Sequence, residues 1–249
     1  MRTAYQTYVI SLARAADKHA RFLERNAATS LRFERFDAVD GRALSRAEAV
    51  STGWIADSAQ HYTAGAIGCA ASHLALWQRA VQSQTNFLIF EDDVHCRHDI
   101  AVKIDGLLTS LKDWDVILLG YNTDAVLDFA APDGSRVSGF MAGESPTPEA
   151  LEMFAQDSSD VAAARLNNAF GLCAYLVSPR GAAALAGLFP RDNRSVLISA
   201  NKPKFGTDTF TCMTIDLLTN TLYRQLQAYV PIPPLALALN EKATSTTRR

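Results

Sequence analysis

The stretch that most constrains the fold is a short apolar run that ends in three consecutive carboxylates. Residues 87–90, Phe-Leu-Ile-Phe, are followed by Glu91, Asp92 and Asp93, and Val94 resumes the apolar pattern. A short apolar run between polar flanks is typical of a buried strand in an α/β sheet. Ligands of open α/β sheets bind beyond the carboxyl ends of the strands, so we expect the acids at a ligand-binding edge.

Three adjacent carboxylates at such a position are costly unless a partner compensates their charge. Like charges repel, and burial without a partner is unfavourable enough to force protonation. A divalent cation removes that cost, and hard oxygen ligands suit Mg²⁺ or Mn²⁺. The sequence therefore predicts a site for a metal ion and a diphosphate. A solvated acidic turn after a strand is the alternative.

The composition is that of an ordinary globular protein. The chain has 249 residues, of which 48% are hydrophobic and 20% charged, and its net charge is −2. We expect one domain over residues 1–249. The charge balance favours neither nucleic acid nor an anionic membrane, and no apolar run approaches the roughly 18 residues of a membrane span. The start shows no signal-peptide core and the four cysteines form no CxxC pair, so we expect a cytoplasmic protein with reduced thiols.

Strand and helix patterns alternate along most of the chain. The expected strands are 8–12, 32–39, 87–90, 114–120, 171–178 and 222–230, and the expected helices are 15–26, 45–50, 64–77, 100–111, 149–154, 179–188 and 209–218. Apart from its short helix, 121–168 carries turn signals and is expected to be an irregular loop region on the acceptor side. Residues 240–249 are expected to form a mobile tail. Neither a dinucleotide fingerprint nor a P-loop is present.

A second informative stretch begins at Thr63, a predicted helix N-cap. Gly65 and Gly68 would let this helix approach the sheet, or a ligand, closely. Cys69 and His73 lie one helical turn apart, and such a pair packs more often than it binds a metal, so we expect packing. A later group matches no zinc spacing and is interpreted as the exposed start of a loop and helix: His95, Cys96, His98 and Asp99.

Several motifs occur in one order along nearly the whole chain. They are Val9-Ile10-Ser11-Leu12-x-Arg14, Phe36-Asp37-Ala38 to Gly41, Gly68-Cys69-x-x-Ser72-His73-x-x-x-Trp77, Ile89-x-Glu91-Asp92-Asp93, Ala174-Tyr175-Leu176-Val177-Ser178, Thr207-Asp208 and Pro233-Pro234-Leu235. In this combination the chain resembles glycosyltransferase family 25, the lipooligosaccharide galactosyltransferases of bacteria and their relatives in collagen glycosylation. No motif of this set falls within 121–168.

The resemblance implies an α/β protein of the GT-A type, in which a central mixed, mostly parallel sheet is flanked by helices. It also implies an inverting transferase that moves a hexose, expected to be galactose, from a UDP-sugar to a glycan such as lipooligosaccharide. The acceptor would be lipid-linked and met on the cytoplasmic side of a membrane. At most peripheral membrane association is expected, and the polar tail offers no obvious amphipathic helix that would support it.

The chemistry of the acidic stretch agrees with that implication. Departure of a sugar diphosphate needs its charge neutralised, which a divalent ion held by carboxylates does as a Lewis acid. Glu91 and Asp93 face one way if the strand pleat persists, which imitates a DxD motif. They are the predicted Mn²⁺ or Mg²⁺ ligands, Asp93 directly. Asp92 is predicted to act through water or on the ribose.

Inversion needs a general base that takes the proton of the acceptor hydroxyl. Asp208, expected to open a helix after a loop, is the predicted base, and an ordinary aspartate with a pKa of about 3.9 is ionised at pH 7. The alternative is that Asp208 only caps that helix, with Thr207 as a competing cap.

The predicted donor-binding residues follow the first two strands or lie on the helix after Thr63. They are Ser11, Leu12, Arg14, Asp40, Ser72, His73 and Asp92. For Arg14 a solvated surface charge is equally compatible with the sequence, and for Asp40 a plain Asp-Gly turn. Ser72 and His73 are assigned on the resemblance, because physical reasoning alone makes them a buried polar pair on a packed helix.

Two other functions stay open at this stage. A family member without catalysis could serve as a binding subunit, although the intact Glu91-Asp92-Asp93 and Asp208 disfavour this. A receiver-type signalling domain also holds Mg²⁺ in an acidic cluster. Its acids come from two separate strands, however, and it needs only about 120 residues.

Overall fold

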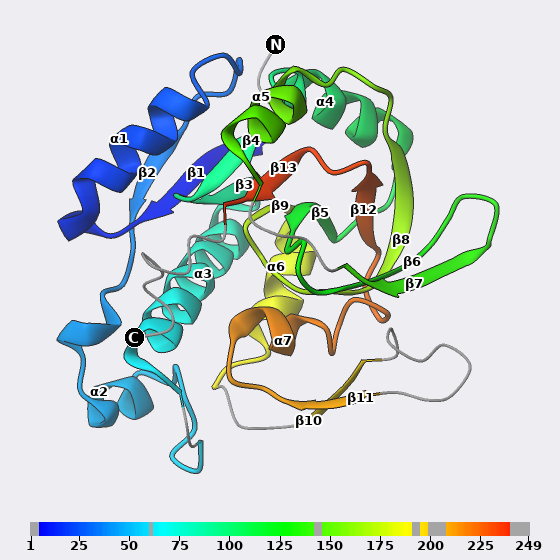
Figure 1. The fold of residues 1–249 in the computed structure, drawn as a ribbon. Coiled ribbons are helices and arrows are strands. Elements are labelled where there is room, and N and C mark those ends of the chain that lie inside the picture. Colours follow the sequence, from blue (N-terminus) through cyan, green and yellow to red (C-terminus); the bar gives the residue numbers. More distant parts are fainter. Residues whose placement is uncertain (1–4, 60–61, 142–145, 191–194, 199–207, 240–249) are drawn as a thin grey trace.

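A computed structural model describes residues 5–59, 62–141, 146–190, 195–198 and 208–239, and the structural statements below concern these residues. They form one mixed sheet with helices on both faces (Figure 1). The predicted fold class, an α/β sheet flanked by helices, is confirmed. Among the described helices, no candidate for a membrane span is present.

The strands of the main sheet follow the order β2-β1-β3-β9-β5-β12-β8-β6-β7, with β13 joining β5 to β4. Their bounds are β1 Tyr5–Ser11, β2 Glu34–Asp37, β3 Asn86–Glu91, β4 Val94–Cys96, β5 Val116–Tyr121, β6 Val126–Ala130, β7 Arg136–Phe140, β8 Ala162–Ala169, β9 Ala174–Val177, β12 Ala228–Ile232 and β13 Ala236–Ala238. A separate two-stranded sheet pairs β10 Ser195–Ile198 with β11 Asp208–Thr211.

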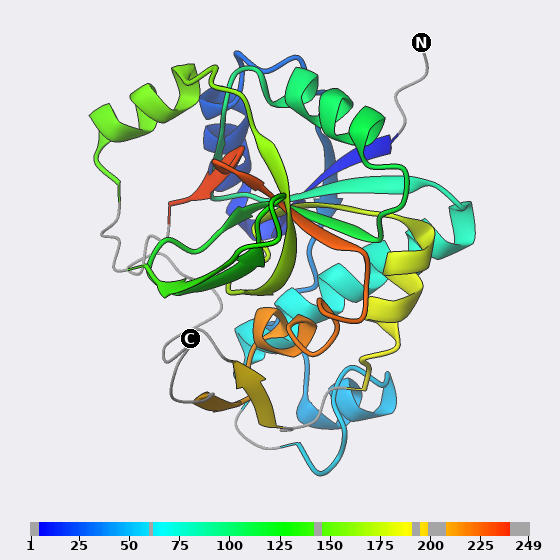
Figure 2. The same cartoon turned by 90° about the vertical axis from the view of Figure 1, so that its right-hand side faces the viewer.

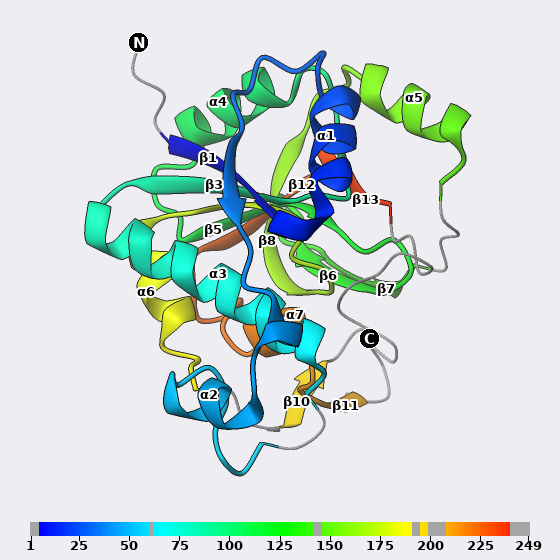
Figure 3. The ribbon, with the colours of Figure 1, turned by 90° about the vertical axis from the view of Figure 1, so that its left-hand side faces the viewer.

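The helices divide between the two faces of the sheet, as Figure 2 shows. Their bounds are α1 Ala16–Arg25, α2 Arg46–Ser51, α3 Ala64–Ser83, α4 Ile100–Ser110, α5 Pro148–Gln156, α6 Pro179–Ala186 and α7 Ile215–Thr219, with short 3₁₀ turns η1 Ala13–Ala15 and η2 Gly41–Ala43. Helices α1 and α4 pack on one face, and α3, α6 and α7 pack on the other. Figure 3 shows α1 and α3 on opposite sides of β1 and β3.

Each face of the sheet has its own apolar core, because successive side chains of a strand point to opposite sides. In β3, Phe87 and Ile89 belong to the core under α3, whereas Leu88 and Phe90 belong to the core under α1 and α4. All four side chains are fully buried. This burial on both faces explains why the strand is an unbroken apolar run in the sequence.

The first three strands bring the predicted site together. β1 pairs in parallel with both β2 and β3, and the register places Ile10 opposite both Phe36 and Glu91. Their carboxyl ends therefore meet at one edge of the sheet. On its other side β3 pairs with β9, which lies between β3 and β5 and runs antiparallel to both. The carboxyl end of β9 therefore does not lie with those of β1, β2 and β3.

The expectation that 121–168 is irregular was wrong. β6 and β7 form a hairpin whose turn contains Gly134, and β8 pairs with β6 and β12. Charged residues inside these strands hide the strand pattern. Asp128 of β6 is fully buried, and Arg136 of β7 forms an ion pair with it.

Two further expectations need correction. The segment 209–218 is not one helix, because its start lies in β11 and a short helix, α7, begins at Ile215. His95 and Cys96 are buried in β4, which pairs with β13, so they are not an exposed loop. Thr207 and the expected tail 240–249 lie outside the described residues.

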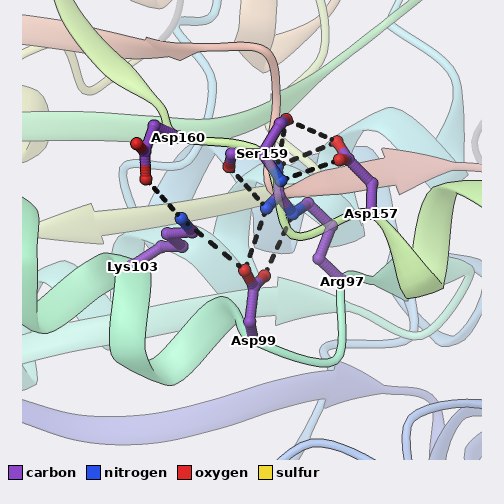
Figure 4. A network of polar contacts seen from close by, with 6 residues as sticks. All are labelled: Arg97, Asp99, Lys103, Asp157, Ser159 and Asp160. Atoms are coloured by element: carbon purple, nitrogen blue, oxygen red, sulfur yellow. Dashed lines mark hydrogen bonds and ion pairs between the residues drawn. The ribbon is translucent and has the colours of Figure 1, made fainter.

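A buried ion-pair network fixes the chain after β4 to the segment before β8 (Figure 4). Arg97 is fully buried; its Nη1 lies 3.0 Å from Asp157 Oδ2 and its Nη2 lies 2.9 Å from Asp99 Oδ2. Arg97 also donates to the backbone oxygen of Ser159 at 2.8 Å. A buried guanidinium with this many partners is a structural element, because losing one partner would leave charge uncompensated.

Candidate active site

A cavity of about 330 Å³ opens at the carboxyl ends of β1, β2 and β3. It is bounded by side chains from α1 on one side and from the first half of α3 on the other. Nine of the ten residues predicted for the site line it: Ser11, Leu12, Arg14, Asp40, Ser72, His73, Glu91, Asp92 and Asp93. The tenth, Asp208, lies in β11, and its side chain is outside the described set.

The parallel register of β1 and β3 explains the contact between their ends. Ser11 follows Ile10, the partner of Glu91, and its hydroxyl donates to Asp92 Oδ2 at 2.7 Å. Burial raises the pKa of Asp92, and the hydrogen bond from Ser11 lowers it again in part. Ser11 therefore holds the carboxylate of Asp92 in the cavity wall.

Glu91 is held by a buried chain of hydrogen bonds. Trp77 Nε1 donates to Tyr175 Oη at 2.9 Å, Tyr175 Oη lies 2.8 Å from His73 Nδ1, and His73 Nε2 lies 3.3 Å from Glu91 Oε1. The side chains of Trp77, Tyr175 and His73 are fully buried. If Tyr175 donates to Nδ1, then Nε2 carries the ring proton and donates to Glu91, which satisfies every donor.

Asp93 differs from its two neighbours because one of its carboxylate oxygens has no hydrogen-bond partner in the described part of the chain and the charge of Lys18 offsets its burial only in part. Its Oδ1 is buried without a hydrogen bond among the described residues. Burial, followed by the charges of Glu91 and Asp92, raises the pKa of Asp93 to about 7. A cation beside Oδ1 would relieve both effects, so the residues present fit the hard divalent ion that the sequence predicts.

The route by which Asp93 reaches the cavity is not the predicted one. β3 ends at Glu91, and Asp92 and Asp93 form a turn before β4. The strand pleat therefore does not continue to Asp93. Instead, Leu239 donates its backbone N–H to the carbonyl oxygen of Asp93 at 3.1 Å and ties this turn to the end of β13.

Two glycines allow α3 to approach the loop after β2. A Cβ atom at Gly68 would lie 2.4 Å from the backbone oxygen of Val39, and one at Gly41 would lie 1.8 Å from that of Ala64. Ser72 Oγ accepts from Val39 N at 2.9 Å and donates to Gly68 O at 2.7 Å. Gly68 therefore lets the helix pack closely against a loop that lines the cavity, and the hydrogen bond of Ser72 holds the same loop in position.

Arg14 and Asp40 close the cavity rim between the loops after β1 and β2. Arg14 Nε lies 2.6 Å from Asp40 Oδ2, and this hydrogen bond lowers the pKa of Asp40. Their side chains remain 43% and 30% exposed, so the pair contributes little to stability. Both groups can therefore face a polar ligand in solution.

The sequence reasoning missed cations and one acid of the cavity. Lys18, Arg21 and Arg25 of α1 all line it, at the spacing i, i+3 and i+7 that places side chains on one helix face. Asp216, in the first turn of α7, also lines it, and its Oδ2 accepts from Gly171 N at 3.0 Å. The basic spacing was visible in the sequence, whereas nothing near Asp216 pointed to the cavity.

Comparisons with known proteins identify relatives of the chain. The family model "Glycosyltransferase family 25 (LPS biosynthesis protein)" matches residues 4–193. "Inactive glycosyltransferase 25 family member 3" of Mus musculus is 30% identical over 129 residues, which are 46% of this chain and 22% of that protein. "Procollagen galactosyltransferase 2" of Homo sapiens is 28% identical over 127 residues, 46% of this chain and 20% of that protein.

An Anopheles gambiae "Glycosyltransferase 25 family member" is 30% identical over 124 residues, 45% of this chain and 21% of that protein. The matched segments thus span about a fifth of these relatives. Among solved structures, "Crystal Structure of A197 from STIV" covers 90% of this chain and 79% of its own, with 8% identity and a TM-score of 0.39. No conclusion is based on a likeness that low.

Proposed function

Because the chain belongs to glycosyltransferase family 25, we propose that it transfers a hexose, galactose, from a UDP-sugar to a hydroxyl group of a glycan. Reaction with inversion at the anomeric carbon, a lipooligosaccharide acceptor, and a cytoplasmic location with peripheral access to the membrane are parts of this proposal. One observation carries it: a cavity at the strand ends is lined by Asp93, whose buried Oδ1 has no hydrogen-bond partner among the described residues, and by the cations Lys18, Arg21 and Arg25.

A divalent ion, Mn²⁺ or Mg²⁺, would be held by Asp93 directly and by Glu91. Mg²⁺-type sites commonly use one or two carboxylates and complete their shell with substrate phosphates. When bound, such an ion would neutralise the charge of the leaving diphosphate. Lys18, Arg21 and Arg25 line the same cavity and would add positive charge along the diphosphate.

The remaining cavity residues would bind and orient the donor. Arg14 and Asp40 lie at the rim, where a planar guanidinium and a carboxylate suit the base and ribose of a nucleotide. Asp92, fixed by Ser11, would contact the ribose directly or through water. Leu12 lines the same end of the cavity.

The base that takes the acceptor proton is assigned to Asp208 or Asp216. Asp208 was predicted from the sequence, but it does not open a helix. Asp216 does lie in the first turn of a helix and lines the cavity, and Gly171 N fixes one of its oxygens. A base must lie within reach of the hydroxyl it deprotonates, which favours Asp216. Asp216→Asn should abolish transfer without loss of UDP binding, whereas Asp208→Asn should still transfer the sugar. If instead only Asp208→Asn abolished transfer, Asp208 would be the base.

The test of the function is calorimetric titration of UDP into the purified chain, with Mn²⁺ or with EDTA. We expect binding that depends on Mn²⁺ and is lost in Asp93→Ala. UDP-galactose, UDP-glucose and other UDP-sugars are then compared for hydrolysis and transfer. Binding that EDTA does not change would retain the donor site but remove the metal. No binding in either condition would refute the donor site.

A second candidate function is that of a binding subunit without catalysis. One observation favours it: the name of one relative, "Inactive glycosyltransferase 25 family member 3", describes that protein as inactive. UDP binding without turnover of any UDP-sugar, by a chain with an intact acid cluster, would favour it.

A further inference from the structure

Three side chains with metal-ligating atoms converge in the wall of the cavity. They are Cys69 and His73 of α3 and Glu91 of β3, and their ligand atoms all lie within 4.8 Å of one another. Glu91 Oε1 lies 3.3 Å from His73 Nε2 and 3.9 Å from Cys69 Sγ. In the described part of the chain no other three His, Cys, Asp or Glu side chains meet that criterion.

The spacing of these atoms suits a tetrahedral ion. Zn²⁺ binds sulfur at about 2.3 Å and nitrogen or oxygen at about 2.0–2.1 Å, which places neighbouring ligand atoms about 3.3–3.6 Å apart. The two separations from Glu91 Oε1, 3.3 and 3.9 Å, are close to this range, and the third, between the ligand atoms of Cys69 and His73, is within 4.8 Å, so side-chain adjustment can bring the three atoms around one ion. Cys69 and His73 stand one turn apart on a helix of 20 residues, so their backbones are already in place.

The ligand set selects a different ion from the one proposed at Asp93. A thiolate, an imidazole and one carboxylate suit Zn²⁺ and similar thiophilic ions, whereas Mg²⁺ and Mn²⁺ prefer oxygen. Three protein ligands also leave a fourth position for water or a ligand, and here that position opens into the cavity that Cys69, His73 and Glu91 line.

His73 has beside its Nδ1 the kind of partner that a metal-bound histidine uses. Its Nδ1 lies 2.8 Å from the hydroxyl of Tyr175, and both side chains are fully buried. Histidine ligands generally donate their second N–H to such a partner, which fixes the ring orientation. With an ion on Nε2, the ring proton lies on Nδ1 and Tyr175 accepts it, while the thiol proton of Cys69 passes to solvent.

We propose that Cys69, His73 and Glu91 form a site for Zn²⁺ or a similar thiophilic divalent ion, and that its occupation inhibits the transferase. The site stands on its own geometry, whereas the inhibition rests on the proposed function. Zn²⁺ at Glu91 Oε1 would withdraw this carboxylate from the hard metal site and would occupy the cavity beside Asp93.

The site is tested with Co²⁺, which replaces Zn²⁺ in such sites and reports bound thiolate by a sulfur-to-cobalt charge-transfer band in the near ultraviolet. We expect this band at one equivalent of Co²⁺, its loss in Cys69→Ser, its weakening in His73→Gln, and its displacement by Zn²⁺. Asp92→Asn is the matched control, because it removes a neighbouring carboxylate outside the trio and should retain the band. Absence of the band in the folded wild type, or its persistence in Cys69→Ser, would refute the site.

Inhibition is tested by repeating the Mn²⁺-dependent UDP titration with one equivalent of Zn²⁺. We expect Zn²⁺ to lower the UDP affinity of the wild type by about tenfold or more, which is the size of effect seen when a metal site loses a supporting partner. Zn²⁺ should not change the UDP affinity of Cys69→Ser. An unchanged affinity in the wild type, with the cobalt band present, would overturn the inhibition. If the proposed function itself is wrong, UDP does not bind even in the absence of Zn²⁺, and this result is distinct from a failure of the inhibition.

Discussion

The buried Oδ1 of Asp93, which has no hydrogen-bond partner among the described residues, predicts a conflict between stability and function that can be measured. In the folded chain the pKa of Asp93 is raised from 3.8 to about 7 by burial and by the charges of Glu91 and Asp92. Below about pH 4 the group is protonated in the folded and unfolded chain alike, and it contributes no difference. Between about pH 4 and 7 the unfolded chain releases the proton while the folded chain retains it, so stability falls as the pH rises.

The size of this effect follows from the shift. A difference of about 3 units, at about 1.4 kcal/mol for each unit, sets a ceiling of about 4 kcal/mol above pH 7. Partial exposure of Asp93 to solvent and sharing of charge with its neighbours reduce the expected value to about 2 kcal/mol. For a chain of this size that corresponds to about 4–8 °C in Tm.

The perturbation is Asp93→Asn, which keeps the side-chain shape and removes the ionisation. Thermal unfolding is measured in EDTA at pH 5 and pH 8 for the wild type, for Asp93→Asn and for a control variant, Asp57→Asn. Asp57 is an exposed acid that does not belong to the acidic cluster. We expect the wild type to lose about 2–5 °C between the two pH values relative to Asp93→Asn, because the unfolded chain has already released most of this proton at pH 5 and part of the total loss precedes that pH. The control should follow the wild type.

Metal addition completes the assay. Mn²⁺ at pH 8 should raise the Tm of the wild type, because the ion binds the folded state, and should leave Asp93→Asn almost unchanged. Equal pH-dependent losses in the wild type and Asp93→Asn would refute the reasoning, because the burial of an uncompensated charge would then have no measurable cost.

Three further perturbations follow from the structure. Gly68→Ala would place a Cβ 2.4 Å from a backbone oxygen of the loop beneath it, so it should cost about 1–3 kcal/mol in chemical denaturation and weaken UDP binding. Gly106→Ala, where a Cβ meets nothing within 4 Å, is its control and should not destabilise. Tyr175→Phe removes the hydroxyl that accepts from Trp77 and contacts His73 Nδ1, and it should cost about 1–3 kcal/mol and lower Mn²⁺ affinity through Glu91; unchanged affinity would contradict the positioning role. Arg97→Met removes a fully buried guanidinium and its hydrogen bonds to Asp99, Asp157 and Ser159 and should cost about 1–3 kcal/mol, which a urea titration would detect; unchanged stability would contradict it.

The elements that the sequence predicted well are those whose signals are local. Thr63 caps α3 and accepts from Ala66 N at 3.0 Å, and Ser45 begins α2 with a capping box. The apolar run 87–90 is a strand buried on both faces. In each case the residues that specify the structure lie within a few positions of one another.

The elements that sequence reasoning missed depend on pairing between distant segments. β9 runs antiparallel between β3 and β5, which no local pattern in Ala174–Val177 reveals. β6 escaped prediction because Asp128 interrupts its apolar pattern, and one of the two arginines that compensate this charge, Arg224, lies 96 residues away. The division of 209–218 into a strand and a short helix likewise depends on the pairing of β11 with β10.

The candidate site was predictable in its members but not in their contacts. Nine residues were named from strand ends and motifs, and they share one cavity because parallel strands end at one edge. Ser72 and His73 were assigned to the donor, yet the structure gives each a protein partner: Ser72 holds the loop after β2, and His73 holds Glu91. Which partner a buried polar group finds is set by tertiary packing, not by its own sequence context.

The three consecutive acids therefore differ in what holds them, although the sequence presents them as equals. Glu91 accepts from the buried His73, and Asp92 accepts from Ser11, so both carboxylates have a fixed orientation without any ion. Asp93 alone has a buried oxygen without a hydrogen-bond partner among the described residues, together with a raised pKa. A folded chain retains such an uncompensated group only at a cost, and a bound cation is the ligand that removes it. Asp93 is therefore the residue whose substitution should separate metal binding from folding.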